Sequence, residues 1–285
     1  MNFGKFAVMG GDLRFRLFAE ALQADKQEVY RFFLSPKEHH PLSDLANANY
    51  VMLPLPISKD GVHLNAPFSE EPIPLHNLFT KFHPRQIIFG GMVDAKIQTL
   101  ADAYGLKLFD YYDEESLILP GALATAEGAI ALSITETQNM LQGQKALILG
   151  FGRIAKILAQ KLAVLGVDVT ITARKAVDLH WANTLAYHTV ALADIDDHIQ
   201  EFDLIFNTVP HPILDFRKLV FLKPNALCIE LASKPYGIDL KSAENLGVHT
   251  ILAESLPGKV APNSMALALK DTIYSLLNTI HPTET

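Results

Sequence analysis

Residues 145–155 read KALILGFGRIA, and this stretch decides the fold of the second half of the chain. The apolar strand Lys145–Leu149 runs directly into the pattern G-x-G-x-x-A, and the segment after it has the apolar period of an amphipathic helix. Gly150 permits a tight turn, Gly152 lets a pyrophosphate approach the backbone, and Ala155 allows the helix to pack closely on the strand. The sequence therefore predicts a dinucleotide site at the positive end of this helix, made by Gly150, Phe151, Gly152, Arg153 and Ile154. The alternative, a tight turn that binds nothing, is disfavoured by the strand–turn–helix context.

The residues at the end of the next strand bear on which dinucleotide binds. That strand is predicted over Val167–Thr172, and Ala173, Arg174 and Lys175 follow it with no acidic residue. An NAD enzyme usually carries Asp or Glu here, which accepts hydrogen bonds from the ribose 2′-hydroxyl. A carboxylate would repel a 2′-phosphate, whereas an Arg guanidinium binds it through two parallel hydrogen bonds. We therefore expect NADP(H) rather than NAD(H); the alternative is that both cations only solvate a surface turn.

Outward from this motif, short apolar runs alternate with segments of helical period along the whole chain. This alternation predicts an α/β fold with two doubly wound parallel-sheet domains, the second a Rossmann NAD(P)-binding domain. Further strands of the second domain are expected at Leu185–Thr189, Asp203–Asn207, Ala226–Leu231 and Val248–Leu252. The first domain is predicted to contain strands Lys5–Met9, Glu28–Phe33, Tyr50–Leu53, Gln86–Phe89 and Leu106–Phe109, with helices Leu13–Ala24 and Asp94–Tyr104.

Prolines and glycines mark the expected domain boundaries. We place an N-terminal α/β substrate and catalytic domain at residues 1–122 and the Rossmann domain at residues 123–262. A helix over Thr125–Leu141 is expected to bridge them, with Gly143 after its end. A last helix, within residues 263–285, is expected to pack back on the first domain. The Pro-rich stretch Pro54–Pro74 breaks the periodicity and is predicted to be a long surface loop.

Composition narrows the classes of partner. The 285 residues are 49% hydrophobic and 19% charged, a globular balance, and the net charge is −7 with no block of Lys and Arg, so nucleic acid is not an expected partner. We find no apolar stretch of the roughly 18 residues that a membrane span needs and no signal-peptide pattern, so we expect a cytoplasmic protein without a membrane partner. The only cysteine, Cys228, lies in an apolar run and is predicted to be a core residue. The eleven histidines, which include His39 and His40, show no metal-ligand spacing, so no metal site is expected.

Several segments are candidates for a substrate site, which we expect in the cleft between the two domains. The first strand–helix turn carries Asp12 and Arg14, and Arg14 is expected either to meet a substrate carboxylate or to lie on a solvated helix face. Ser233 and Lys234 follow the strand Ala226–Leu231. Lys259 lies in the stretch Leu256–Pro262, where two prolines and a glycine predict a turn.

Two more positions carry alternative interpretations. Thr208, Val209 and Pro210 end the fourth strand of the Rossmann domain and are expected to face the nicotinamide; the alternative is a proline-terminated strand of no functional weight. His211, which follows them, is more simply explained as a loop histidine than as an acid or base. Glu127 is expected near the start of the bridging helix, where it would either stabilise the positive helix end or take part in catalysis.

Six blocks, in this order and spacing, resemble the dipicolinate synthase A-subunit family over nearly the whole chain. They are Val8–Arg14, Ala124–Gly128, Leu149–Arg153, Asn207–Pro210, Glu230–Pro235 and Leu256–Pro262. Two departures concern the shape of the substrate pocket. Tyr236 stands where an S-[RK]-P-G-G pattern has glycine, and His211-Pro212 stands where small or apolar residues are more usual.

The resemblance implies an activity in spore formation: oxidation of dihydrodipicolinate to dipicolinate in the mother cell, with NADP⁺ as acceptor. It also implies a second, flavoprotein-like subunit, and we expect a homo-oligomer. The substrate is a small dicarboxylate, for which Arg14, Lys234 and Lys259 would serve as electrostatic clamps. The catalytic candidates are Glu127, Ser233 and Lys259, none of which rests on a known family role. Two alternatives stay open, another NADP-dependent dehydrogenase of the methylenetetrahydrofolate type and a nucleotide-binding subunit without catalysis of its own.

Overall fold

The structure is a computed structural model that describes residues 3–36 and 40–281. The chain forms two compact units, the first made of Met1–Pro120 with Ala261–Thr285 and the second of Gly121–Val260. Both divisions lie two residues before the boundaries expected from the sequence. The ends of the expected first domain, residues 1–2 and 282–285, lie outside the described residues, as does His39.

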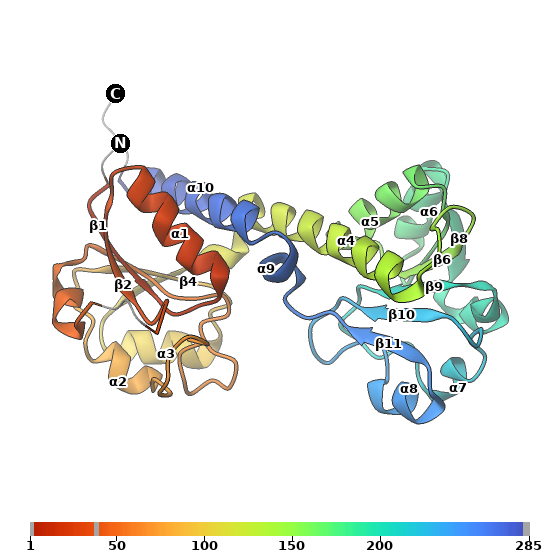
Figure 1. Ribbon diagram of the computed structural model, residues 1–285, viewed down its shortest axis with the longest axis horizontal. Helices are drawn as coiled ribbons and strands as arrows, with labels where there is room; N and C mark the ends of the chain where they lie inside the picture. The colour runs from red at the N-terminus through yellow and green to blue at the C-terminus, as the bar shows by residue number, and fades with distance from the viewer. Residues whose placement is uncertain (1–2, 37–39, 282–285) are drawn as a thin grey trace. The chain divides into compact units, whose positions relative to one another are not determined.

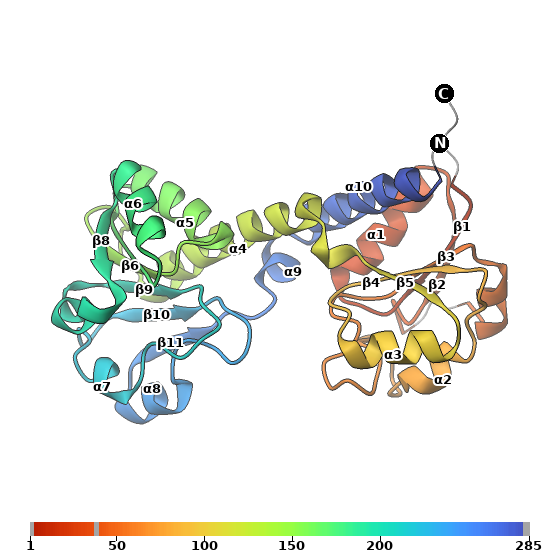
Figure 2. The ribbon, with the colours of Figure 1, turned by 180° about the vertical axis from the view of Figure 1, so that it is seen from behind.

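The first unit is built on a five-stranded parallel sheet in the order β2-β1-β3-β4-β5 (Figure 1). Its strands begin and end within one residue of the predicted positions: β1 (Lys5–Met9), β2 (Glu28–Phe32), β3 (Tyr50–Met52), β4 (Ile87–Gly90) and β5 (Lys107–Asp110). One face carries α1 (Leu13–Ala24) and α10 (Pro262–Ile280), and the other carries α2 (Leu75–Phe79) and α3 (Ala95–Ala103) (Figures 1 and 2). Short 3₁₀ helices lie at η1 (Leu42–Asn47) and η2 (Tyr111–Asp113).

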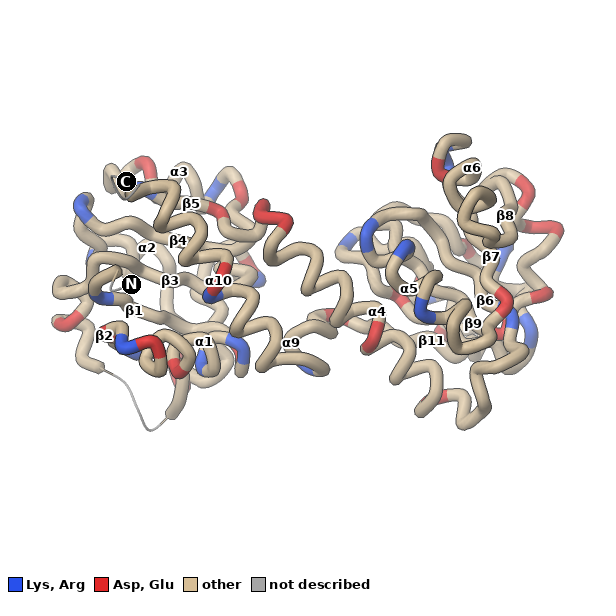
Figure 3. The backbone as a smooth tube through the Cα atoms, turned by 90° about the horizontal axis from the view of Figure 1, so that it is seen from above, with Lys and Arg blue, Asp and Glu red and all other residues tan. Residues whose placement is uncertain are grey.

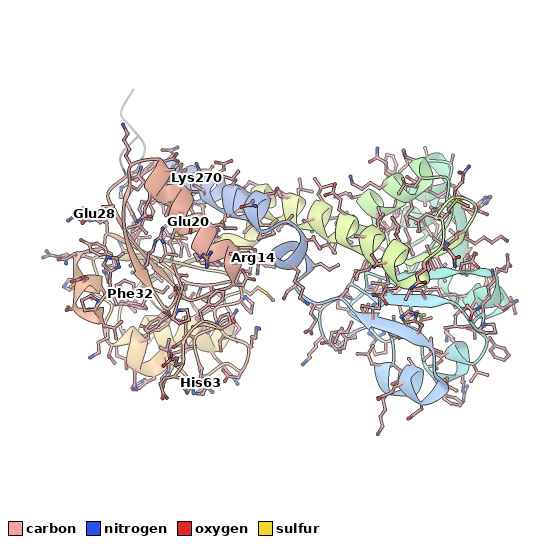
Figure 4. The ribbon with its side chains drawn as sticks, viewed as in Figure 1. Arg14, Glu20, Glu28, Phe32, His63 and Lys270 are labelled. Atoms are coloured by element: carbon pink, nitrogen blue, oxygen red, sulfur yellow. The ribbon has the colours of Figure 1, made fainter. Side chains whose placement is uncertain are left out.

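Helix α10 returns from the end of the second unit and completes the first. It packs along α1, which buries Phe15, Phe18 and Leu22. At the C-terminal end of α1, the Asp25 carboxylate accepts hydrogen bonds from Lys270 Nζ at 2.7 Å and from the Tyr274 hydroxyl at 3.1 Å (Figure 4 labels Lys270). The first unit is therefore discontinuous in sequence.

The Pro-rich segment 54–74 lies mostly at the surface, as the sequence predicts, but Pro54, Ile57 and Leu64 are buried and anchor it. Ile57 is fully buried and Leu64 is 5% exposed, because the segment folds over the carboxyl ends of the strands. Backbone groups of Leu53 and of the segment find partners there: Leu53 N donates to the Phe89 carbonyl at 2.7 Å, and the Asn65 carbonyl accepts from Gly11 N at 2.7 Å. Irregular backbone can be buried when such partners satisfy it, and prolines supply the bends.

Helix α4 (Glu115–Thr137) begins in the first unit and ends in the second. The predicted bridging helix, Thr125–Leu141, starts ten residues too late because Pro120 suggested a break. Pro120 lies near the start of the helix, where it removes one backbone hydrogen bond of a 23-residue element. Gly143, with φ of +83°, is not the helix cap; it lies in the turn before the next strand.

Helix α4 also corrects the expectation that no apolar stretch is long enough to span a membrane. By length and composition alone it could do so, although 44% of its apolar window is buried inside the protein. Ala126, Ala129 and Ser133 are fully buried, and the two alanines belong to the core of the second unit. A core helix of a globular domain can have the same length and apolar composition. The packing of Ala126 and Ala129 in the core of the second unit accounts for the apolar composition of α4.

The second unit is built on a six-stranded parallel sheet in the order β11-β10-β9-β6-β7-β8, the order of a full dinucleotide-binding domain. Its strands are β6 (Lys145–Leu149), β7 (Asp168–Ala173), β8 (His188–Ala191), β9 (Leu204–Asn207), β10 (Leu227–Glu230) and β11 (His249–Leu252). Helices α4, α5 (Arg153–Val164) and α6 (Ala176–Thr184) lie on one face; α7 (Phe216–Leu219) and α8 (Leu240–Leu246) lie on the other (Figures 1 and 2). Two short 3₁₀ helices, η3 (Leu192–Asp197) and η4 (Ile199–Glu201), lead into β9. The predicted fold class is confirmed for both units.

Two predicted elements of the second unit are displaced. Strand β8 starts three residues after the predicted Leu185, because Leu185 caps α6 and Ala186 has φ of +62°. The expected turn over Leu256–Pro262 is largely a short helix, α9 (Leu256–Val260). A proline at the second helical position loses no hydrogen bond, so Pro257 starts this helix rather than preventing it.

Candidate functional site

The turn between β6 and α5 lies where the strand order reverses, between β6 and β9. In open α/β sheets this is where ligands bind. Gly150 has φ of +97°, and a Cβ on it would lie 2.7 Å from both Thr208 Oγ1 and Val209 Cγ2. The Thr208 hydroxyl in turn donates to the Leu149 carbonyl at 2.7 Å. Thr208 and Val209 therefore form the wall of the turn, and only glycine fits at position 150.

Gly152 has the opposite surroundings. It is the N-cap residue of α5, its backbone is extended (φ −82°, ψ −164°), and no side chain caps the helix. A Cβ on Gly152 would meet no heavy atom within 4 Å. An uncapped helix N-terminus with open space above a glycine fits a diphosphate, which would accept hydrogen bonds from the first backbone N–H groups.

The neighbours of Gly152 are placed as a dinucleotide turn requires. Phe151 is only 5% exposed and packs into the core, so it offers the turn its backbone alone. Lys156 Nζ lies 5.2 Å above the Phe151 ring. Ala155 is fully buried between α5 and the sheet, whereas Arg153 is exposed on the first helical turn and Ile154 is half-buried.

The two cations predicted to select the cofactor lie directly after β7, the neighbour of β6. Ala173 ends that strand and is 7% exposed, while Arg174 and Lys175 are exposed. Within residues 3–36 and 40–281, no ion pair or side-chain hydrogen bond engages either cation. Lys and Arg are interspersed with Asp and Glu along both units (Figure 3).

A buried polar pair at the ends of β9 and β10 was missed by the sequence analysis. Asn207 and Glu230 are fully buried, and Asn207 Nδ2 donates to Glu230 Oε1 at 2.6 Å. Asn207 also shapes the following turn, because its Nδ2 donates to the Val209 carbonyl at 2.9 Å and its Oδ1 accepts from Val209 N at 3.1 Å. The sequence did contain a signal for this pair: a Glu and an Asn each end an apolar strand of a parallel sheet, and such strands are buried on both faces.

The loop after β10 carries Ser233 and Lys234, which are both exposed. Carboxyl ends of β6, β9 and β10 follow one another in the sheet, so these residues lie on the side of the glycine turn away from Arg174. Tyr236, at the position where the family pattern has glycine, has φ of +63°. Its hydroxyl donates to the Glu254 carboxylate, and this bond raises the pKa of Tyr236 to about 12.

The equivalent turn of the first unit is closed. Asp12 caps α1 by accepting from Arg14 N at 3.0 Å, and it also accepts from Arg14 Nε at 2.9 Å and Nη2 at 2.8 Å. Arg14 is 8% exposed and donates to the Leu55 carbonyl at 3.3 Å (Figure 4). The interpretation of Arg14 as part of a solvated helix face is therefore wrong, and its charge is already balanced by Asp12.

Glu127 does not lie near the start of a helix, so its predicted role at a positive helix end is wrong. It is the thirteenth residue of α4, and its carboxylate accepts from Lys161 Nζ at 2.9 Å. Lys161 lies eight residues into α5, roughly 12 Å along the helix from the glycine turn. This exposed ion pair gives Glu127 a surface role.

The remaining predicted residues are placed as follows. Lys259 is exposed on α9, which packs on α4 at Gly128, where a Cβ would lie 3.2 Å from Leu256 and Val260 side-chain atoms. Cys228 is fully buried in β10, which confirms it as a core residue, and burial raises the pKa of its thiol to about 12. Among residues 3–36 and 40–281, no group of three or more His, Cys, Asp or Glu is arranged to hold a metal ion.

The fold and the glycine turn define the class: a two-domain dehydrogenase whose second domain is a Rossmann NAD-binding domain. The sequence profile of the D-isomer specific 2-hydroxyacid dehydrogenase NAD-binding domain matches residues 124–233. The profile of the N-terminal domain of the dipicolinate synthase A subunit matches residues 5–112. The chain is thus an oxidoreductase of the NAD(P)-dependent type.

Relatives over the full length agree with this assignment. The dipicolinate synthase A subunit of Bacillus subtilis (strain 168) is 28% identical over 292 residues, which cover 98% of both chains. The crystal structure of the dipicolinate synthase A chain from Bacillus subtilis superposes with a TM-score of 0.86 at 26% identity, covering 98% of this chain and 97% of that one. The crystal structure of the dipicolinate synthase A subunit from Bacillus halodurans gives 0.85 at 22% identity, covering 97% and 98%. The chain is thus similar to dipicolinate synthase A subunits in its first domain, over its full length and in its fold, which confirms the resemblance of the six sequence blocks.

Proposed function

We propose that this protein oxidises dihydrodipicolinate to dipicolinate with NADP⁺, as one subunit of an enzyme used in spore formation. The observation that carries the proposal is the open, uncapped turn at Gly152 together with Arg174, which follows the neighbouring strand and has no ion-pair partner among the described residues. The name of the Bacillus subtilis relative supplies the product, dipicolinate, and its being one subunit implies a partner chain. We propose a flavoprotein-like second subunit, assembly as a homo-oligomer and location in the mother-cell cytoplasm.

The cofactor would be held by two features of the second unit. Backbone N–H groups of the first turn of α5 would bind the diphosphate, with Gly152 allowing the close approach. The Arg174 guanidinium would bind the 2′-phosphate through two charge-assisted hydrogen bonds, with Lys175 adding positive charge. Thr208, Val209 and Pro210 would line the nicotinamide side. When bound, NADP⁺ accepts a hydride from the substrate.

The substrate carries two carboxylates, and exposed cations are the groups that would hold them. We propose Lys234 and Lys259, which have no ion-pair partner among the described residues, with the Ser233 hydroxyl as a further donor. Arg14 would bind a substrate carboxylate only together with Asp12, because the two side chains already form an ion pair. Oxidation of the dihydropyridine ring releases a hydride and a proton and yields an aromatic product, so the protein mainly orients the ring. Glu127 has no part in this proposal.

The cofactor proposal is tested by titrating the purified chain with NADPH and NADH. Arg174→Ala is expected to weaken NADPH binding by about 1–3 kcal/mol, the range for a hydrogen bond to a charged group, and to leave NADH binding within about twofold. Arg217→Ala, which removes an equal charge from an exposed position on α7, is the matched control and should change neither affinity. Equal losses for both cofactors would remove the 2′-phosphate role.

The reaction is tested by assaying dihydrodipicolinate oxidation and methylenetetrahydrofolate oxidation side by side. We expect turnover of dihydrodipicolinate only, with NADPH appearing as dipicolinate forms. The chain is assayed alone and with a flavoprotein-like partner added. A chain that binds NADPH but oxidises neither substrate in either state would leave a nucleotide-binding subunit without catalysis of its own.

A further inference from the structure

Among the residues that the structure describes, no Lys, Arg or His forms an ion pair with the buried Glu230 carboxylate. It is fully buried at the end of β10, and four hydrogen bonds from neutral groups balance its charge. Oε1 accepts from Asn207 Nδ2 at 2.6 Å and from Ala232 N at 2.9 Å, while Oε2 accepts from Gly237 N and Ile238 N, both at 2.9 Å. Burying a carboxylate is costly unless such donors surround it, so its arrangement constrains every group that donates to it.

Three of these donors belong to the loop after β10, and the fourth is the last residue of β9. Ala232, Gly237 and Ile238 hold both ends of the loop that presents Ser233 and Lys234. Asn207 belongs to β9, and its amide also bonds both backbone groups of Val209, in the turn proposed to face the nicotinamide. The single carboxylate therefore joins the loop proposed for substrate to the loop proposed for cofactor.

The packing around Asn207 is tight. A Cβ on Gly237 would lie 2.4 Å from Asn207 Nδ2 and 2.6 Å from its Oδ1, so Gly237 leaves the space that the amide occupies. Asn207 cannot move away from Glu230 without displacing Gly237 or the Val209 turn. The two loops therefore share one geometry.

We propose that Glu230 is a positioning residue that sets the substrate loop and the nicotinamide-side turn relative to each other. It contacts neither ligand and acts through Asn207 and the amides of residues 232, 237 and 238. The proposal rests on the proposed function and adds to it the residue that aligns the two binding loops. It predicts that loss of the carboxylate leaves the diphosphate and 2′-phosphate contacts intact and misaligns the reacting rings.

The test compares Glu230→Gln with a substitution of Asp203, a carboxylate at the opposite, amino end of the strands of the same sheet. The glutamine amide would point a donor at N–H donors and so lose bonds without changing the side-chain size. Asp203→Asn is the control: Asp203 accepts from Lys145 N at 2.9 Å and Lys223 Nζ at 2.7 Å, before the start of β9 and away from the binding loops. Three readouts are taken for each variant: amide hydrogen exchange, fluorescence of bound NADPH, and steady-state kinetics.

For Glu230→Gln we expect faster exchange at the amides of residues 232, 237 and 238, and emission of bound NADPH shifted toward that of free NADPH. The turnover number should fall about tenfold to a hundredfold, the effect of misplacing a reacting group. The dissociation constant of NADPH should stay within about twofold, because the proposed phosphate contacts come from the first turn of α5 and from Arg174, none of which bonds Glu230 or its donors. Asp203→Asn should lower thermal stability without moving any of the three readouts.

A second variant guards against a folding defect in the first. Gly237→Ala leaves the carboxylate in place and displaces Asn207 from the other side, so it should reproduce the emission shift and the loss of turnover. Unchanged emission and turnover in both variants, with NADPH still bound, would overturn the positioning role alone. Wild-type protein that binds neither nucleotide would overturn the proposed function and this inference together.

Discussion

The first strand–helix turn of each unit has the same backbone plan and the opposite chemistry. Gly10 and Gly150 both follow the first strand with positive φ, and their N–H groups donate to the neighbouring strand, to Phe32 and Thr172 respectively, at 2.9 and 2.8 Å. Two residues later, Asp12 is the N-cap of α1 and Gly152 is the N-cap of α5. The first turn therefore carries a carboxylate where the second carries a hydrogen atom.

The contacts around the two N-cap residues differ accordingly. In the first unit, Gly11 N bonds the Asn65 carbonyl, Asp12 caps the helix, and the charge of Asp12 binds Arg14. In the second unit no side chain caps α5, and the space above Gly152 is open. A doubly wound sheet alone does not make a dinucleotide site; an unfilled helix N-terminus is also required.

The largest expected effect comes from giving the second turn the N-cap of the first. Gly152→Asp should fold, because the backbone is extended and a Cβ at this position meets no heavy atom within 4 Å. Asp is a favoured N-cap, so thermal stability should hold or rise slightly. A carboxylate beside the diphosphate costs several kcal/mol, so NADPH affinity should fall about a hundredfold or more, measured by fluorescence titration.

Gly152→Ala is the control, because it adds the Cβ without the charge. We expect a loss of affinity between those of wild type and Gly152→Asp. Undiminished NADPH binding by Gly152→Asp would mean that the diphosphate lies elsewhere.

The reverse change should have a smaller effect, and on stability rather than binding. Asp12→Gly removes the ion-pair partner of the buried Arg14 and leaves its guanidinium with the Leu55 carbonyl. We expect a decrease of about 1–3 kcal/mol in the free energy of unfolding, measured with urea. The variant should gain no affinity for NADPH, because the Asn65 carbonyl and the segment around it still cover the turn.

Asp12→Asn separates the two roles of Asp12. Its side-chain oxygen can still cap α1, so it should lose only the charge interaction with Arg14. If Asp12→Asn and Asp12→Gly are as stable as wild type, the pair contributes nothing to the first unit.

The smallest expected effect is on the stability of the first unit, which α10 completes by returning from the end of the second unit. Only the first needs a returning helix, and Asp25 binds that helix through Lys270. The hydrogen bond from Lys270 holds the pKa of Asp25 below its usual value of 3.8. A lowered folded-state pKa means that the stabilisation is present above pH 4 and is lost as pH falls through the folded-state value.

Asp25→Asn should therefore lower the free energy of unfolding by about 0.2–1 kcal/mol at pH 7, the range for an exposed pair. The difference from wild type should shrink as pH falls below 4 in urea unfolding. Glu20→Gln, whose carboxylate lies 3.7 Å from Arg16 on the same helix, is the control for a carboxylate that does not reach α10. A difference that persists unchanged at pH 3 would show that Asp25 acts through something other than its charge.

The local sequence pattern was sufficient to predict the strands and the glycine turn. Strand Lys145–Leu149 and helix Leu13–Ala24 have the predicted bounds because apolar period and turn residues act over neighbours in sequence. The same holds for Gly150, Gly152 and the cations after β7, whose chemistry is carried by residue type at a fixed spacing. The resemblance to dipicolinate synthase A subunits followed from the order of such local blocks.

Contacts between distant residues decided the rest. Packing placed Pro120 inside a helix, buried Ile57 and Leu64 of the surface segment 54–74, and put Glu127 beside Lys161. Arg14 became buried because Asp12 and the Leu55 carbonyl reach it together. Glu230 acquired the donor from β9, the Asn207 amide, only when β9 and β10 became neighbours. The sequence by itself determined which residues could bind a dinucleotide; the tertiary structure decided which of its charges remain free, since a charge is neutralised by its neighbours in space rather than along the chain.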